Sequence, residues 1–198
     1  MDKLLDNINL VRIREFLHAY HIPGLHDILL EHKDLMDKIF ENGDKERNEQ
    51  NQNNVMLSDN DLTKIVAKVN LNIVKKYYDA GENYGNPEEV GIYRQTNEEY
   101  ASNFHVHHKS TMISTMYINP PAKGEGGEFM IQIPPHQAQS FQVKKDWVYF
   151  IPGWLPHTPS PQISSTPRYC INWAYDSNIR AFNKLTGAYD DTGSKKNF

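Results

Sequence analysis

Residues 147–175 read WVYFIPGWLPHTPSPQISSTPRYCINWAY and decide the expected fold. In this stretch, short runs of β-branched and aromatic residues alternate with Pro and Gly, which is the pattern of short strands joined by turns. The same pattern continues upstream in further runs, at 90–96, 103–108, 110–119, 127–133 and 140–143. Many short strands in one segment predict a sandwich or barrel rather than a parallel α/β sheet. We therefore expect an α+β, mainly β protein with a double-stranded β-helix (jelly roll) core and N-terminal supporting helices.

The first half of the chain has the hydrophobic spacing of helices. Apolar residues recur at mixed helical intervals over 4–17 and again over 25–40, which predicts two helical stretches. Residues 43–57 are polar and rich in Asn and Gln, so we expect a loop or partly disordered linker there. This predicts an N-terminal helical segment and polar linker over 1–57. Residues 58–198 then form a single β-helix domain with its supporting helix, and the whole is expected to be one compact domain.

The supporting helix is expected just after the linker. Its apolar residues fall on one helical face: Leu62, Ile65, Val66, Val69 and Ile73. Ser58, followed three residues later by Asp61, resembles a capping box at the start of this helix. Gly81 is its expected end.

Composition excludes several classes of protein. The chain has 198 residues, a formal net charge of -4 and one cysteine, Cys170, so no intrachain disulfide is possible. No segment approaches the roughly 20 apolar residues of a membrane span, and the start, MDKLLDNINL, lacks the apolar region of a signal peptide. These features favour a cytoplasmic protein and disfavour membrane and nucleic-acid partners, while an oligomer stays open.

The charge is unevenly distributed along the chain. Residues 1–100 hold 12 basic and 19 acidic residues, whereas residues 101–198 hold 9 and 6. Between Ala101 and Asn172 the carboxylates are Glu125, Glu128 and Asp146. A segment so poor in acids suits an anionic ligand. The alternative is that the acidic residues of the first half simply lie on solvated helices.

Three histidines form a candidate metal site. On a strand, His105 and His107 point to the same face with Cα atoms about 6.6–6.8 Å apart, whereas on a helix they diverge by about 200°. The metal hypothesis therefore requires that this segment is a strand. His157, from a distant strand, can complete one face of a coordination sphere and leave other positions open for small ligands. The alternative is a set of partly exposed histidines that are hydrogen-bonded to their neighbours.

The order of these motifs resembles the core of the Fe(II)/2-oxoglutarate-dependent oxygenase superfamily. The similarity is closest to small, uncharacterised oxygenases of bacteria and tailed phages, and covers about residues 100–176. The later stretch matches their order of residues at Phe150, Pro152, Leu155, His157, Pro161 and Arg168. Tyr117-Ile118-Asn119 resembles the Y-L-N strand of the prolyl-hydroxylase branch, and Gly126-Gly127-Glu128 resembles its glycine-rich turn.

This resemblance implies an enzyme, a dioxygenase with Fe(II) as cofactor and 2-oxoglutarate and dioxygen as small-molecule partners. It implies that His105 and His157 ligate the iron. Arg168 would form a bidentate ion pair with the distal carboxylate of 2-oxoglutarate, and Tyr117 would donate a hydrogen bond to the same carboxylate. If the gene is carried by a phage, the host cytoplasm is the expected location.

The chain departs from the superfamily at one ligand. The family places a carboxylate two residues after the first histidine, and here that position is His107. Either the site has three neutral histidines, or a carboxylate such as Glu125 or Glu128 joins it. Three imidazoles leave Fe(II) with its full charge, which favours a dianion such as 2-oxoglutarate.

Two other functions stay open. One is a cupin-like three-histidine metalloenzyme that does not use 2-oxoglutarate, because Pro152-Gly153 before His157 resembles the second cupin motif. The cupin glutamate expected a few residues after the H-x-H pair is missing, however, with Ile113 or its neighbours in that place. The other is a non-catalytic jelly-roll module whose histidines are incidental.

Overall fold

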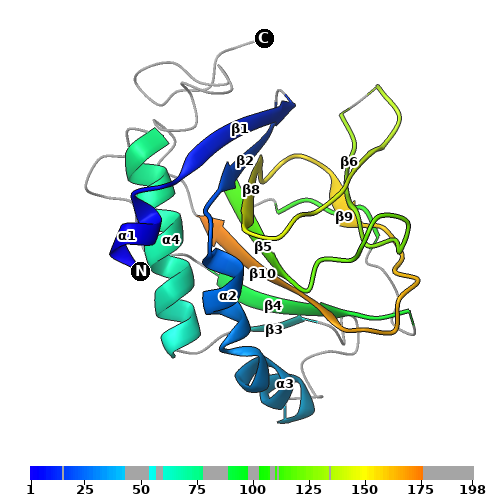
Figure 1. Ribbon diagram of the computed structural model, residues 1–198. Helices are drawn as coiled ribbons and strands as arrows, with labels where there is room; N and C mark the ends of the chain where they lie inside the picture. Colours follow the sequence, from blue (N-terminus) through cyan, green and yellow to red (C-terminus); the bar gives the residue numbers. More distant parts are fainter. Residues whose placement is uncertain are drawn as a thin grey trace.

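The computed structural model places a twisted sheet beside one long helix (Figure 1). The residues that it describes are 1–14, 16–42, 54–56, 60–77, 89–97, 103–107, 110, 112–133 and 135–175. Their helices are α1 (Asp2–Leu5), α2 (Leu25–Leu30), α3 (Lys33–Asn42) and α4 (Asp61–Tyr77). Their strands are β1 (Asn9–Arg14), β2 (Leu17–His21), β3 (Asn54–Met56), β4 (Glu89–Gln95), β5 (Met112–Ile118), β6 (Phe129–Ile131), β7 (Gln139–Phe141), β8 (Trp147–Pro152), β9 (His157–Pro159) and β10 (Arg168–Tyr175).

The described strands form two antiparallel sheets. The larger has the order β1-β2-β8-β5-β10-β4-β3, and the smaller has the order β7-β6-β9. Helix α4 lies along one face of the larger sheet, and the smaller sheet lies on the opposite side (Figure 1). The fold is therefore mainly β with few helices, as the short runs in the second half predicted.

Central strands of the larger sheet divide their side chains between two cores. In β5, Met112 and Met116 pack on the α4 side, whereas Ile113 and Tyr117 pack on the other side with Phe129 of β6. This division follows from the period of two along a strand. The odd-numbered residues of β5 therefore face the space between the sheets, where polar side chains also gather.

Helix α4 has the predicted apolar face and a different cap. Its buried apolar residues include Leu62, Val66, Val69 and Ile73. The cap is Asn60, whose Oδ1 accepts a hydrogen bond from the backbone N–H of Thr63 at 2.9 Å. Ser58 and Gly81, the predicted cap and end, lie outside the described residues. None of the described helices has the length and apolar character needed to cross a membrane.

The prediction of a helix over 4–17 is wrong after the first turn. α1 ends at Leu5, and the chain continues as the hairpin β1–β2, with Asn9 opposite His21. β2 is paired on both edges by β1 and β8, and it is also covered on both faces, because Leu17 packs in one core and Tyr20 in the other. A strand buried on both faces lacks the alternation of polar and apolar residues that identifies a strand in a sequence.

Three other segments differ from expectation in detail. The stretch 25–40 is helical as predicted, but as two helices, α2 and α3. Residues 54–56 of the expected linker form β3, because their backbone pairs with β4. Backbone pairing of this kind does not depend on an apolar pattern in the sequence. Residues 103–107 form one isolated bridge instead of a strand. The strand expected at His157 is present as β9, which is three residues long.

Candidate metal centre

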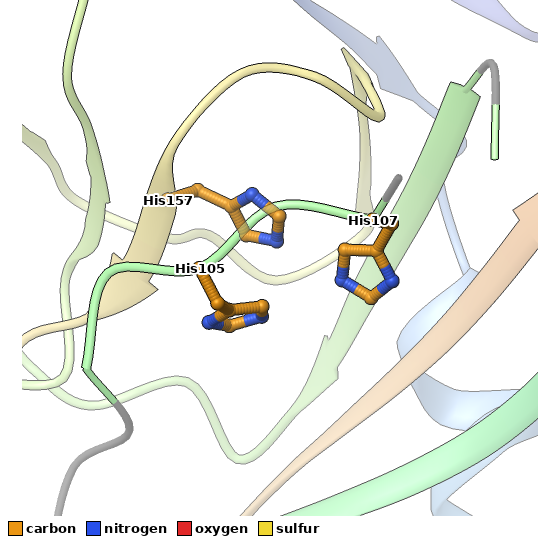
Figure 2. A group of neighbouring side chains, drawn as sticks. All are labelled: His105, His107 and His157. Carbon is orange, nitrogen blue, oxygen red and sulfur yellow. The ribbon is translucent and has the colours of Figure 1, made fainter. Parts of the chain in front are cut away.

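His105, His107 and His157 come together between the two sheets (Figure 2). The first two lie on the segment before β5, and His157 opens β9. One ring nitrogen from each lies within 4.8 Å of the others, and the ring centroids are 4.5 to 5.2 Å apart. The three imidazoles therefore share one small space, as a tridentate metal site requires.

Backbone pairing brings the histidines together, and strand alternation does not. The N–H of His105 donates to the carbonyl of His157 at 3.1 Å, and the N–H of His157 donates back at 3.1 Å. The N–H of His107 donates to the carbonyl of Gly153 at 2.8 Å. A Cβ at Gly153 would lie 1.8 Å from the carbonyl oxygen of Ser110, so only glycine fits this approach. The condition that residues 105–107 form a strand was wrong, but the rings converge nonetheless.

Second hydrogen bonds fix the tautomers of two of these histidines. Nδ1 of His105 lies 2.9 Å from the carbonyl oxygen of Asn103, and Nδ1 of His157 lies 2.8 Å from that of Leu155. A carbonyl only accepts hydrogen bonds, so each Nδ1 carries a proton, and in the neutral ring the lone pair then lies on Nε2. This is the arrangement that metal-binding histidines commonly have.

Burial also holds two of the rings, those of His107 and His157, in the neutral form. Burial, with a smaller contribution from nearby His105, lowers the pKa of His107 to about 4. Burial is the main cause at His157 as well, and lowers its pKa to about 3. A neutral imidazole is the form that binds a metal ion, so both ligands are ready at pH 7.

These lowered pKa values predict a pH-dependent stability of the metal-free protein. Between pH 6.5 and about 4, the unfolded chain takes up protons at His107 and His157 while the folded chain does not, so stability falls as the pH falls. Above pH 6.5 both residues are neutral in either state and contribute nothing. We expect His157→Asn to flatten this part of the profile in thermal melts with a chelator. Parallel profiles of variant and wild type would contradict the lowered pKa.

Among the described residues, the two candidate carboxylates, Glu125 and Glu128, do not join the histidines. Glu125 accepts a hydrogen bond from the backbone N–H of Ala122 at 2.8 Å, and Glu128 accepts one from the hydroxyl of Ser160. Neither residue belongs to the histidine group, which contains no carboxylate among the residues that the structure describes. A cavity adjoins the histidines, and no carboxylate is found among the described residues that line it.

A cavity of about 90 Å³ adjoins the histidines. Its lining includes all three of them, together with alternate residues of two neighbouring strands: Thr115 and Tyr117 of β5, and Arg168, Cys170 and Asn172 of β10. Aromatic and apolar side chains complete the described wall: Tyr93, Ile113, Phe129, Ile151 and Pro159. Sequence reasoning identified Tyr117 and Arg168 but missed Thr115 and Asn172, which alternation along the two strands could have shown.

Arg168 is a buried cation without a carboxylate partner in the described structure. The side chain is 1% exposed. Its Nη1 donates to the carbonyl of Gly127 at 2.6 Å and its Nη2 donates to Oε1 of Gln95, while Nε has no partner. A buried charge is costly unless it is paired, so this guanidinium suits an anionic ligand in the cavity.

Tyr117 lies against that cation. The guanidinium carbon of Arg168 is 5.1 Å from the centroid of the Tyr117 ring, which is a cation–π distance. Burial, the largest cause, holds the pKa of the Tyr117 phenol well above its usual value. The hydroxyl therefore stays protonated and able to donate a hydrogen bond to an anion.

Cys170, Thr115 and Asn172 form a small polar group in the same wall. The Cys170 thiol lies 2.6 Å from the hydroxyl of Thr115 and donates to Oδ1 of Asn172 at 3.0 Å. Burial raises the pKa of the thiol. Cys170 is thus a neutral hydrogen-bonding group rather than a thiolate nucleophile.

Solved structures that resemble this chain include prolyl hydroxylases. A Trichoplax adhaerens prolyl hydroxylase in complex with a hypoxia-inducible-factor peptide fragment superposes with a TM-score of 0.63 at 16% identity, over 91% of this chain and 89% of that one. A Pseudomonas putida prolyl-4-hydroxylase gives 0.56 at 9% identity, over 88% and 98%. At such identities the likeness shows the fold.

A third similar structure is a prolyl 4-hydroxylase from Phytophthora capsici, with a TM-score of 0.60 at 16% identity. The match covers 90% of this chain and 63% of that protein, so this chain spans less than two thirds of its length. No protein-family model matches the sequence, and no curated protein matches it. The expected closeness to bacterial and phage oxygenases therefore stays a prediction.

Proposed function

We propose that this protein is an Fe(II)- and 2-oxoglutarate-dependent oxygenase of the hydroxylase type. One observation carries the proposal: three imidazoles that converge on one point share a cavity with a buried arginine that has no carboxylate partner among the described residues. The first feature suits a divalent metal, and the second suits the carboxylate of a small anion. The likeness to prolyl hydroxylases supports the proposal. It also supports a double-stranded β-helix core, which we place with its supporting helices in one domain.

The donor set fits such a cofactor. His105, His107 and His157 would hold the metal by their ring nitrogens, and two backbone carbonyls keep the Nδ1 protons of His105 and His157 in place. When bound, Fe(II) together with 2-oxoglutarate supplies the oxidising chemistry that uses dioxygen. The protein's own part is to orient the two ligands and to exclude water through the apolar wall.

Arg168 and Tyr117 would bind the cosubstrate. Both line the cavity, and the guanidinium of Arg168 lies over the face of the Tyr117 ring. A guanidinium offers two parallel N–H groups to a carboxylate, and the phenol adds a third donor. With no carboxylate among the described lining residues, the cavity carries a net positive charge that a dianion would balance.

A three-histidine metalloenzyme that does not use 2-oxoglutarate is the second candidate. It is favoured by the missing carboxylate ligand, and it leaves Arg168 unexplained.

An anaerobic titration tests the proposal. We expect 2-oxoglutarate to produce a visible charge-transfer band with the Fe(II)-loaded protein and no band with the Zn(II)-loaded protein, which has no accessible redox state. Iron uptake without a band would favour the second candidate. A protein that takes up no metal at all would leave a non-catalytic jelly-roll module.

A further inference from the structure

Gln95 is buried directly beside the cavity's cation. β4 and β10 pair antiparallel with Arg168 opposite Gln95, and the Gln95 side chain is fully buried. Its Oε1 accepts from Nη2 of Arg168, and its Nε2 donates to the carbonyl of Ser160 at 3.0 Å. Turning the amide over would place its NH₂ group against the guanidinium, so these two contacts fix one orientation.

The chemistry of this partner is unusual for a buried arginine. Buried guanidinium groups are normally paired with a carboxylate. Here both acceptors are neutral, namely the Gln95 amide and the Gly127 carbonyl. Glu128 is next to Gly127 in the chain, but its carboxylate accepts from the hydroxyl of Ser160 instead.

Ser160 is hydrogen-bonded to both Gln95 and Glu128. Its hydroxyl holds the carboxylate of Glu128, and its carbonyl accepts from the amide of Gln95. Arg168 is thus fixed in position while its positive charge is left for the cavity, and its Nε stays unpartnered. Glutamate has nearly the shape of glutamine but carries a negative charge. A glutamate at position 95 would therefore pair with Arg168, whereas the neutral glutamine leaves the positive charge of Arg168 for a ligand.

We infer that Gln95 is a positioning residue that holds Arg168 without neutralising it and thereby sets the affinity of the cavity for a dicarboxylate. This inference rests on the proposed function. Gln95→Glu keeps an acceptor for Arg168 but compensates its charge. The variant loses the N–H that donates to the Ser160 carbonyl, and it should bind an added carboxylate more weakly because the charge of Arg168 is already paired.

The test compares Gln95→Glu with the neutral control Gln95→Met. The probe is 2-oxoglutarate, titrated calorimetrically into the Zn(II)-loaded proteins, with thermal melts and Zn(II) affinity measured in parallel. We expect Gln95→Glu to weaken 2-oxoglutarate binding by roughly 10- to 100-fold at unchanged Zn(II) affinity. Gln95→Met also loses the hydrogen bond to Ser160 but leaves the cation uncompensated, so it should lose less affinity than Gln95→Glu.

The affinity ranking separates the two roles: Gln95→Glu is closer in shape to glutamine than Gln95→Met and should nevertheless lose more affinity, which a purely structural role of Gln95 does not predict. A Gln95→Glu protein that binds 2-oxoglutarate as tightly as Gln95→Met or wild type overturns the inference and leaves the proposed function standing. A wild-type protein that binds Zn(II) but not 2-oxoglutarate overturns the proposed function, and the inference with it.

Discussion

Replacing His157 by alanine is expected to remove the metal site, with a loss of metal affinity of about 100-fold or more. His157 contributes one of three ring nitrogens that lie within 4.8 Å of one another, and two remaining imidazoles form a much weaker chelate. The backbone bridge to His105 does not involve the side chain, so the other two ligands should keep their places. Dialysis against Fe(II), Zn(II) or Mn(II), followed by elemental analysis of the untagged protein, measures the effect.

A matched control separates the site from general histidine binding. His136 is exposed and lies apart from the histidine group, so His136→Ala should take up metal like the wild type. The measurements should also show metal raising the melting temperature of the wild type and of His136→Ala, but not of His157→Ala. Equal uptake by all three proteins would mean that the three rings do not hold the ion.

The sequence predicts the strands of the second half well because most are half-buried or fully apolar. WVYFI and RYCINWAY correspond to β8 and β10 within a residue or two. The hairpin β1–β2 could not be predicted in this way, since β2 is covered on both faces and its spacing also fits a helix. β3 is a strand through its pairing with β4, which no local pattern contains.

The site was only partly accessible from the sequence. Strand alternation suggested that His105 and His107 converge, but the structure brings them together through backbone bonds to His157 and Gly153, which are distant in the chain. The family resemblance suggested Arg168 and Tyr117. Gln95 could not be found from the sequence, because its importance depends on the register between β4 and β10.

Replacing Arg168 by methionine is expected to abolish 2-oxoglutarate binding, with a loss of about 100-fold or more, while metal uptake stays close to wild type. Methionine keeps much of the length of the side chain but removes the only cation that lines the described cavity. A carboxylate that enters this wall would then lose its charge partner and remain desolvated, which is costly. Calorimetric titration of the Zn(II)-loaded protein measures the loss.

Arg94→Met is the control for this prediction. Arg94 precedes Gln95 in β4. Its positive charge interacts with Asp37 and Tyr169, and none of these three residues lines the cavity. Its replacement should leave 2-oxoglutarate affinity within about threefold of wild type, because only a charge inside the low-dielectric cavity acts strongly on the ligand. If Arg168→Met lost metal and 2-oxoglutarate together, Arg168 would be holding the sheet and not the cosubstrate. If it lost neither, the anion would bind elsewhere, and the positive cavity would need another explanation.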